Sequence, residues 1–147
     1  MLEAARAANQ KRLRQMVKVA TQAVGGSLHG KKIAVLGLTF KAGTDDLRDS
    51  PSLAIAKGLV AAGAKVTSYD PMVSVSPEGA RHAGSALEAA KEAEVVMVLT
   101  EWPEFTELDL SSLAEAMAGN QIIDTRGLLN KESCQAAGLV LWQVGKG

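Results

Sequence analysis

Three stretches of the sequence decide the fold: Ile33-Ala34-Val35-Leu36-Gly37, the segment from Ser50-Pro51 to Gly63, and Lys65-Val66-Thr67-Ser68-Tyr69. The first is a short apolar run behind two lysines, which is typical of a buried parallel strand. Ser50 is a helix cap and Pro51 takes the first helical position, so a helix is predicted from there to Gly63. The third stretch reads as a second strand. Strand, helix and strand in this order predict a right-handed crossover unit of a parallel sheet.

The same alternation continues to the end of the chain. Residues 72–84 are predicted as loop, and three further strands alternate with helices. The predicted strands are 95–99, 121–124 and 139–144, and the predicted helices are 85–91, 110–117 and 130–137. Five strands alternating with helices predict an α/β fold with an open doubly wound parallel sheet, that is, a Rossmann-like domain of about five strands.

A long helix is predicted before the sheet, from Leu2 to Val24, because this segment has no Gly or Pro and is rich in good helix formers. Its apolar residues recur at a spacing of three or four, so they form one stripe that needs a packing partner. We expect two units: residues 1–29, which suit packing or dimerisation, and residues 30–147, which form the sheet domain.

The composition excludes several classes of protein. Sixteen basic residues balance sixteen acidic ones, so no overall positive field attracts nucleic acid or an anionic membrane. Cys134 is the only cysteine, which rules out an intramolecular disulfide. No apolar stretch approaches the roughly 20 residues of a membrane span, and the N-terminus does not resemble a signal peptide. We therefore expect a cytoplasmic protein.

Ligands of doubly wound sheets bind beyond the carboxyl ends of the strands. In this sequence those ends are followed by residues 37–49, Asp70-Pro71, Thr100-Glu101-Trp102 and Asp124-Thr125-Arg126. A dinucleotide fingerprint would place GxGxxG after the first strand. Gly37 is followed instead by Leu38-Thr39-Phe40-Lys41, so NAD is not expected to bind this sheet in the usual manner.

The loop after the first strand is long and polar. Lys41 and Arg48 are charge-assisted donors, the helix start after Ser50 adds backbone N–H groups, and Phe40 offers a flat apolar surface to a base or sugar. These residues fit a phosphate or nucleotide site. They also fit a loop held by ion pairs, in which Lys41 is solvated and Arg48 pairs with a neighbouring aspartate. The physical chemistry alone leaves both readings open.

At this loop the sequence resembles a known family. Residues 37–52, Gly-Leu-Thr-Phe-Lys-Ala-Gly-Thr-Asp-Asp-Leu-Arg-Asp-Ser-Pro-Ser, are similar to the signature G-x-x-F-K-x-x-T-x-D-x-R-x-S-P of the UDP-glucose/GDP-mannose dehydrogenase family. Asp70, Thr100-Glu101-Trp102 and Asp124-Thr125-Arg126 match further family motifs in the right order. The resemblance covers residues 30–147 well. Residues 2–24 resemble, more loosely, the end of the central helix that joins the two Rossmann-like halves of the family.

The resemblance implies a function. Such enzymes oxidise the C6 alcohol of a nucleotide sugar to a carboxylate with two NAD in turn, and UDP-glucose to UDP-glucuronate is the default reaction. Their C-terminal half holds the nucleotide sugar. By position, Phe40, Lys41 and Arg126 are expected substrate contacts, and Arg48 is expected to reach NAD at the domain interface. Arg126 also has a purely structural reading, as an ion pair beside Asp124.

The same resemblance predicts that the chain is not catalytic alone. The NAD-binding half and the Gly-rich segment with the nucleophilic Cys are both expected outside it, so NAD is expected to be held mainly by that missing half. Cys134 lies in a short amphipathic segment without a neighbouring His and is expected to be structural. His29 and His82 lack metal-ligand spacing, so no metal site is predicted.

The expected partners are a UDP-sugar, the missing domains, and a second copy that packs through the N-terminal helix. The rival hypothesis is a stand-alone nucleotide-binding or dimerisation module derived from the same family. The sequence does not distinguish UDP-glucose, UDP-N-acetylmannosamine and GDP-mannose as the ligand.

Overall fold

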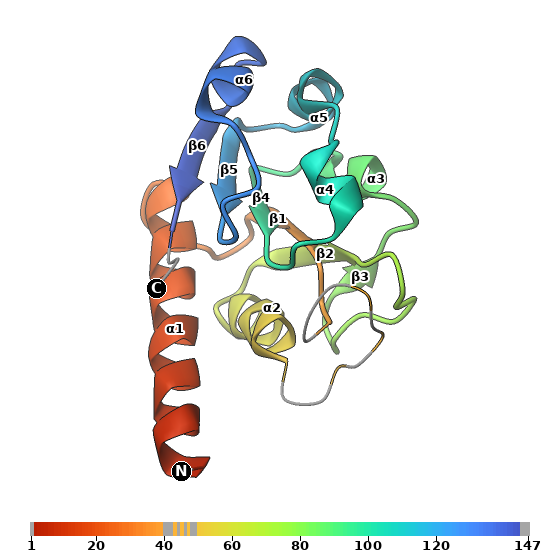
Figure 1. Ribbon diagram of the computed structural model, residues 1–147. Helices are drawn as coiled ribbons and strands as arrows, with labels where there is room; N and C mark the ends of the chain where they lie inside the picture. The colour runs from red at the N-terminus through yellow and green to blue at the C-terminus, as the bar shows by residue number, and fades with distance from the viewer. Residues whose placement is uncertain (1, 40–42, 44, 46, 48–49, 145–147) are drawn as a thin grey trace.

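A single parallel sheet organises the chain (Figure 1). The computed structural model describes residues 2–39, 43, 45, 47 and 50–144, with side chains described from residue 10 onward. The strand order is β3-β2-β1-β4-β5-β6, and every neighbouring pair is parallel. The strands are β1 (Lys32–Leu36), β2 (Lys65–Tyr69), β3 (Arg81–His82), β4 (Val95–Val98), β5 (Gln121–Asp124) and β6 (Val140–Gln143). The predicted α/β, doubly wound architecture is confirmed.

Helices cover both faces of this sheet, which gives three layers. The helices are α1 (Leu2–Ala23), α2 (Pro51–Ala61), α3 (Ala86–Ala90), α4 (Pro103–Thr106), α5 (Leu110–Ala116) and α6 (Lys131–Ala136). One core cluster fills the space between the sheet and α1 and α2, and includes Met16, Leu59 and Val95. A second fills the opposite face beneath α3, α4 and α5, and includes Phe105 and Val96. Successive residues of β4 point to opposite faces, so both clusters draw on the same strand.

The long helix α1 packs on the sheet domain through its predicted apolar stripe. Met16 and Ala20 are fully buried, and Leu13 and Val17 are partly buried against the same cluster. Gly58 of α2 lies opposite, where an added Cβ would stand 2.8 Å from Leu13 Cδ1 and 3.3 Å from Val17 Cγ2. The absence of a side chain therefore lets the two helices approach closely. The N-terminal end of α1 projects beyond the other elements (Figure 1).

Two elements were missed by the sequence prediction. Strand β3 lies within residues 72–84, which are predicted as loop, and pairs with β2 only at Arg81 and His82. Both residues are exposed, so they show no apolar alternation that would indicate a strand. The single turn of α4 also has no periodic pattern, although Pro103 at its start and the buried Phe105 mark it.

Replacement of Met16 by Ala tests the docking of α1. Because this side chain is fully buried, the change should lower the free energy of unfolding by about 3 kcal/mol in urea denaturation. Lys18→Ala on the exposed side of the same helix should change it by less than about 0.5 kcal/mol. Equal, small effects for both variants would mean that α1 is not anchored on the sheet.

Candidate functional site

The crevice of this sheet lies between β1 and β4. The chain builds outward from β1 through β2 to β3, then returns to the other side of β1 to form β4. At such a switch point the connections leave in opposite directions, and ligands of doubly wound sheets bind there, so the region beyond the carboxyl ends of these two strands is called the crevice. Gly37, Leu38 and Thr39 follow β1 here, and Leu99 and Thr100 follow β4.

A buried carboxylate fixes the backbone that leaves β1. Asp70, at the end of β2 and only 3% exposed, accepts hydrogen bonds from the N–H groups of Leu38 at 2.8 Å and Thr39 at 3.2 Å. Its other oxygen accepts from Met72 N at 2.8 Å. Charge-assisted bonds of this kind are strong, particularly away from water. The backbone direction of the loop after β1 is therefore fixed at Leu38 and Thr39.

A second buried carboxylate shapes the loop after β5. Asp124 is fully buried and accepts from the backbone N–H groups of Arg126 and Gly127, each at 2.9 Å, and of Leu129 at 2.8 Å. The Asp124 side chain thus bonds to backbone rather than to the Arg126 guanidinium. Among the described hydrogen bonds, the Arg126 guanidinium does not donate to Asp124, so Arg126 is not held as an ion pair with that carboxylate.

Arg126 is directed to the end of β4. Its Nε donates to the Leu99 carbonyl at 3.0 Å, and Ser52 Oγ of α2 donates to the same oxygen at 3.2 Å. One carbonyl therefore ties the loop after β5 and the first turn of α2 to the switch point. Arg126 is partly buried, and its terminal Nη groups have no hydrogen-bond partner among the described residues.

The start of α2 faces the same crevice. Ser50 Oγ accepts from Leu53 N at 3.2 Å as the helix cap and donates to the Leu38 carbonyl at 2.7 Å. The predicted cap is confirmed, and it also connects the helix to the segment after β1. A helix N-terminus carries partial positive charge, which favours an anion.

A second arginine lies within electrostatic range of Arg126. The pKa of Arg12 on α1 is lowered, mainly by burial and further by the positive charge of Arg126. The guanidinium groups of Arg12 and Arg126 therefore lie close enough for their charges to interact. The sequence analysis missed Arg12 because it lies within the helix that was assigned only to packing.

Tight packing at the switch point explains the glycine after β1. Gly37 has φ of +99°, and an added Cβ would stand 1.7 Å from Thr100 Oγ1 and 2.8 Å from Thr100 Cβ. Thr100 is fully buried, and its hydroxyl and the indole N–H of Trp102 have no hydrogen-bond partner in the described structure. Gly37 is thus required by its conformation and by the Thr100 side chain.

The remaining predicted contacts, Phe40, Lys41 and Arg48, lie outside the described residues. Of the predicted site residues, the structure describes Arg126 alone, in the loop after β5 with its Nε bonded to the Leu99 carbonyl. No group of three or more His, Cys, Asp or Glu side chains suited to a metal occurs among the described residues.

The end of β1 differs in sequence from a dinucleotide fingerprint, because Gly37 is followed by Leu38 and Thr39 and not by the GxGxxG pattern. The buried Thr100 side chain lies against Gly37. Asp70, which follows β2, accepts hydrogen bonds from three backbone N–H groups.

Two ionisable side chains lie away from the crevice. Cys134 on α6 is fully buried, and burial, with a smaller contribution from the Asp124 charge, raises the pKa of its thiol. Tyr69 donates to the Glu104 carboxylate at 3.0 Å, and partial desolvation followed by this bond raises its pKa to about 12. Both groups are neutral at physiological pH.

The sheet topology defines a Rossmann-like domain, with Arg126 and the start of α2 tied to the end of its central strand β4. Residues 34–131 match the model of the UDP-glucose/GDP-mannose dehydrogenase family, UDP binding domain. The chain belongs to this family and contains its UDP-binding domain. The resemblance seen in residues 37–52 is confirmed.

Known relatives agree with this assignment. The chain is 39% identical over 150 residues to a UDP-glucose 6-dehydrogenase of Rhizobium meliloti, covering 99% of this chain and 34% of that protein. A UDP-glucose dehydrogenase structure from Pyrobaculum islandicum shares 25% identity with a TM-score of 0.77, over 97% of this chain and 31% of that one. The structure of an NDP-N-acetyl-D-galactosaminuronic acid dehydrogenase from Methanosarcina mazei shares 26% sequence identity with a TM-score of 0.78, over 92% of this chain and 29% of that one. The chain spans about a third of the length of these relatives.

Replacement of Gly37 by Ala tests the packing at the switch point. Positive φ and the contact with Thr100 should together cost about 4 kcal/mol of unfolding free energy in urea denaturation. Gly30→Ala is the matched control, because Gly30 has φ of +73° with nothing within 4 Å of the added Cβ, and should cost about 1 kcal/mol.

Combination with Thr100→Gly separates the two causes. Since Thr100→Gly removes the side chain that an alanine at 37 would meet, the double variant should be about 2 kcal/mol more stable than the sum of the single effects. Additive effects would show that the contact is not the cause.

The burial of Cys134 predicts slow thiol chemistry. The native protein should react with 5,5′-dithiobis(2-nitrobenzoic acid) at least about a hundredfold more slowly than the unfolded chain, because the thiol is fully buried with a raised pKa. Absorbance at 412 nm follows the reaction with and without denaturant. Rapid reaction of the native thiol would contradict a structural role.

Proposed function

We propose that this chain is the nucleotide-sugar-binding part of an NAD-dependent UDP-glucose 6-dehydrogenase, which oxidises UDP-glucose to UDP-glucuronate. The support is the match to the UDP-binding domain together with the crevice at the β1–β4 switch point. The chain covers only about a third of its relatives, so the oxidation is assigned to the whole protein and not to this part alone.

In this proposal the ligand's diphosphate is the group that the crevice recognises. Arg126 contributes its terminal Nη groups while Nε holds it on the Leu99 carbonyl, which limits the motion of the guanidinium before ligand arrives. The α2 N-terminus, whose cap is bonded to Leu38, lies at the same edge and adds an electrostatic attraction. Arg12 increases the local positive charge.

Phe40 and Lys41 are assigned to substrate as well, on the basis of the family motif in residues 37–52. Lys41 supplies a further cation for the diphosphate, and Phe40 packs on the base or sugar. Arg48 is proposed to contact NAD, which is held mainly by another part of the whole protein, since the GxGxxG pattern is absent after β1.

Two further expectations belong to the same proposal. A second copy packs on the projecting end of α1, supported by the position of that end outside the other elements (Figure 1). The protein acts in the cytoplasm; among the described residues, no helix has the length and apolar character needed to cross a membrane. The division of the chain at residue 29 remains a prediction.

Titration calorimetry of the chain with UDP, UDP-glucuronate and NAD tests the proposal. UDP and UDP-glucuronate should release heat on binding, and NAD should not. Arg126→Ala and Lys41→Ala should each weaken UDP binding by about tenfold or more, because each removes a charge-assisted contact to phosphate.

Lys18→Ala serves as the matched control, since it removes an exposed cation from α1 and should leave UDP binding unchanged. Circular dichroism spectra of all variants check that the fold is retained. Heat from NAD alone, or equal UDP affinity in the Arg126→Ala and control variants, would contradict the assignment.

A further inference from the structure

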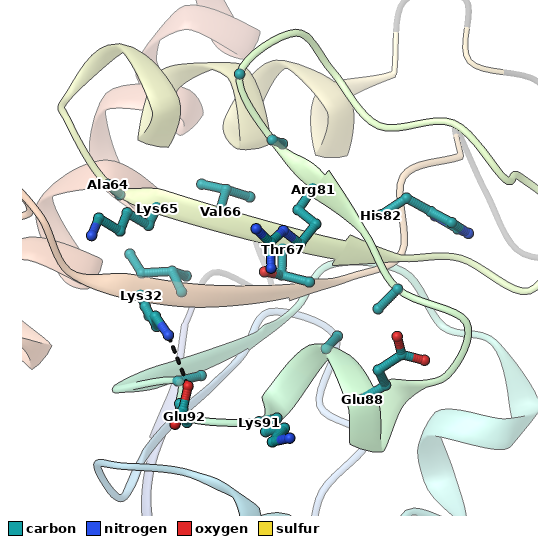
Figure 2. A pocket seen from close by; sticks show the side chains of 16 residues that line it. Lys32, Ala64, Lys65, Val66, Thr67, Arg81, His82, Glu88, Lys91 and Glu92 are labelled. Carbon is teal, nitrogen blue, oxygen red and sulfur yellow. Dashed lines mark hydrogen bonds and ion pairs between the residues drawn. The ribbon is translucent and has the colours of Figure 1, made fainter.

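A second hollow lies at the opposite end of the strands from the crevice. It has a volume of about 870 Å³, which is within the range of small-molecule sites. Figure 2 shows it between the sheet, at β2 and β3, and the end of α3 with the turn that follows. Its walls begin at Lys32 and Lys65, the first residues of β1 and β2, so it opens toward the amino ends of these strands.

Cations from four different elements surround this hollow. Lys32 comes from β1, Lys65 from β2, Arg81 from β3, and Lys91 follows α3. Two carboxylates, Glu88 and Glu92, and the imidazole of His82 also line it. The chain as a whole has no net charge, so the excess of positive charge here is a local property of this surface.

The two carboxylates are already engaged. Glu92 Oε2 accepts from Lys32 Nζ at 2.9 Å, as the dashed line in Figure 2 marks. Glu88 Oε2 accepts from the backbone N–H of Gly84 at 3.1 Å. Lys65 and Arg81 form no ion pair among the described residues, and both are exposed. Two cations of the hollow thus keep their donors available.

The arrangement opposes the stability of the sheet. Lys32 and Lys65 are register partners on neighbouring strands, so their side chains leave the same face side by side. Like charges placed directly opposite one another in a sheet are destabilising. Glu92 neutralises one of the pair, and no described group neutralises the other. Lys65 has no ion-pair partner among the described residues, and an anion bound beside it would offset the repulsion between the two lysines.

The inner wall of the hollow carries hydrogen-bond donors that suit a small ligand. Thr67 on β2 pairs in register with Arg81 on β3, which places a hydroxyl beside the guanidinium on the same face. Buried alanines of the core, Ala83, Ala89 and Ala93, close the hollow behind these groups. A hydroxyl and several N–H donors around a closed base match phosphate oxygens.

We infer that this hollow, defined by Lys65, Thr67, Arg81 and Lys91, binds a small ligand that carries two or more phosphate groups. The cations stand on separate strands and on the end of a helix, so one phosphate does not reach all of them. This site is independent of the crevice at the carboxyl ends, and its occupancy does not depend on the proposed function.

Titration of the ¹⁵N-labelled chain with inorganic pyrophosphate, followed by ¹H–¹⁵N correlation spectra, tests the inference. Pyrophosphate is titrated into the chain without UDP, and UDP is titrated in a separate sample, because UDP also carries two phosphates and would compete at the hollow. Pyrophosphate should shift the amides of residues 65–67, 81–83 and 88–93 in a saturable manner. The Lys65→Ala/Arg81→Ala double variant should weaken this binding by about tenfold or more.

The Arg14→Ala/Lys57→Ala double variant is the matched control, because it removes one exposed arginine from α1 and one exposed lysine from α2. Its affinity for pyrophosphate should stay within about twofold of that of the unchanged chain. Equal affinity in both double variants, or scattered shifts that sodium sulfate at equal ionic strength reproduces, would overturn the site. Tighter binding of a single-stranded oligonucleotide than of pyrophosphate would overturn the ligand class.

The UDP titration reports separately on the crevice. If UDP fails to shift the amides of residues 99–101 and 124–127, the proposed function is contradicted, whatever pyrophosphate does at the second hollow. A response to pyrophosphate at residues 65–67 and 81–83 supports the second site in either case.

Discussion

The hydrogen bonds from Leu38 and Thr39 to the Asp70 carboxylate are the interaction on which the candidate site depends. They turn the chain as it leaves β1 and join the ends of two neighbouring strands. Ser50 then bonds back to the Leu38 carbonyl, so the position of α2 follows from the same turn. A buried carboxylate that lost these donors would be left unsatisfied at a cost of several kcal/mol, which is why the loop has little freedom at its start.

The Leu99 carbonyl plays a comparable part on the other side of the crevice. It receives the hydroxyl of Ser52 and the Nε of Arg126, so three segments that are distant in sequence meet at one oxygen. This explains how an arginine outside regular structure is held in place. The described part of the crevice is thus assembled from backbone acceptors and buried acids.

The sequence predicts most of this architecture because strong local signals mark its elements. The apolar run of β1, the Ser50-Pro51 cap and the alternation of strands and helices all correspond to described elements. Strand β3 could not be predicted, because two exposed residues gain their conformation from pairing with β2 alone. Arg126 was found from the family motif. The proximity of Arg12 depends on how α1 docks, and the excess charge beside Lys65 depends on strand register, which a single sequence does not specify.

The absence of a side chain at Gly58 affects how rigidly α1 and α2 are joined. Leu13 and Val17 of α1 rest against α2 at this point without an intervening side chain on the α2 side. Close-packed interiors have low compressibility and transmit strain, so a push on the projecting end of α1 is not absorbed at this contact. A displacement of α1 at this contact would therefore move α2, whose first turn is bonded through Ser52 to the end of β4.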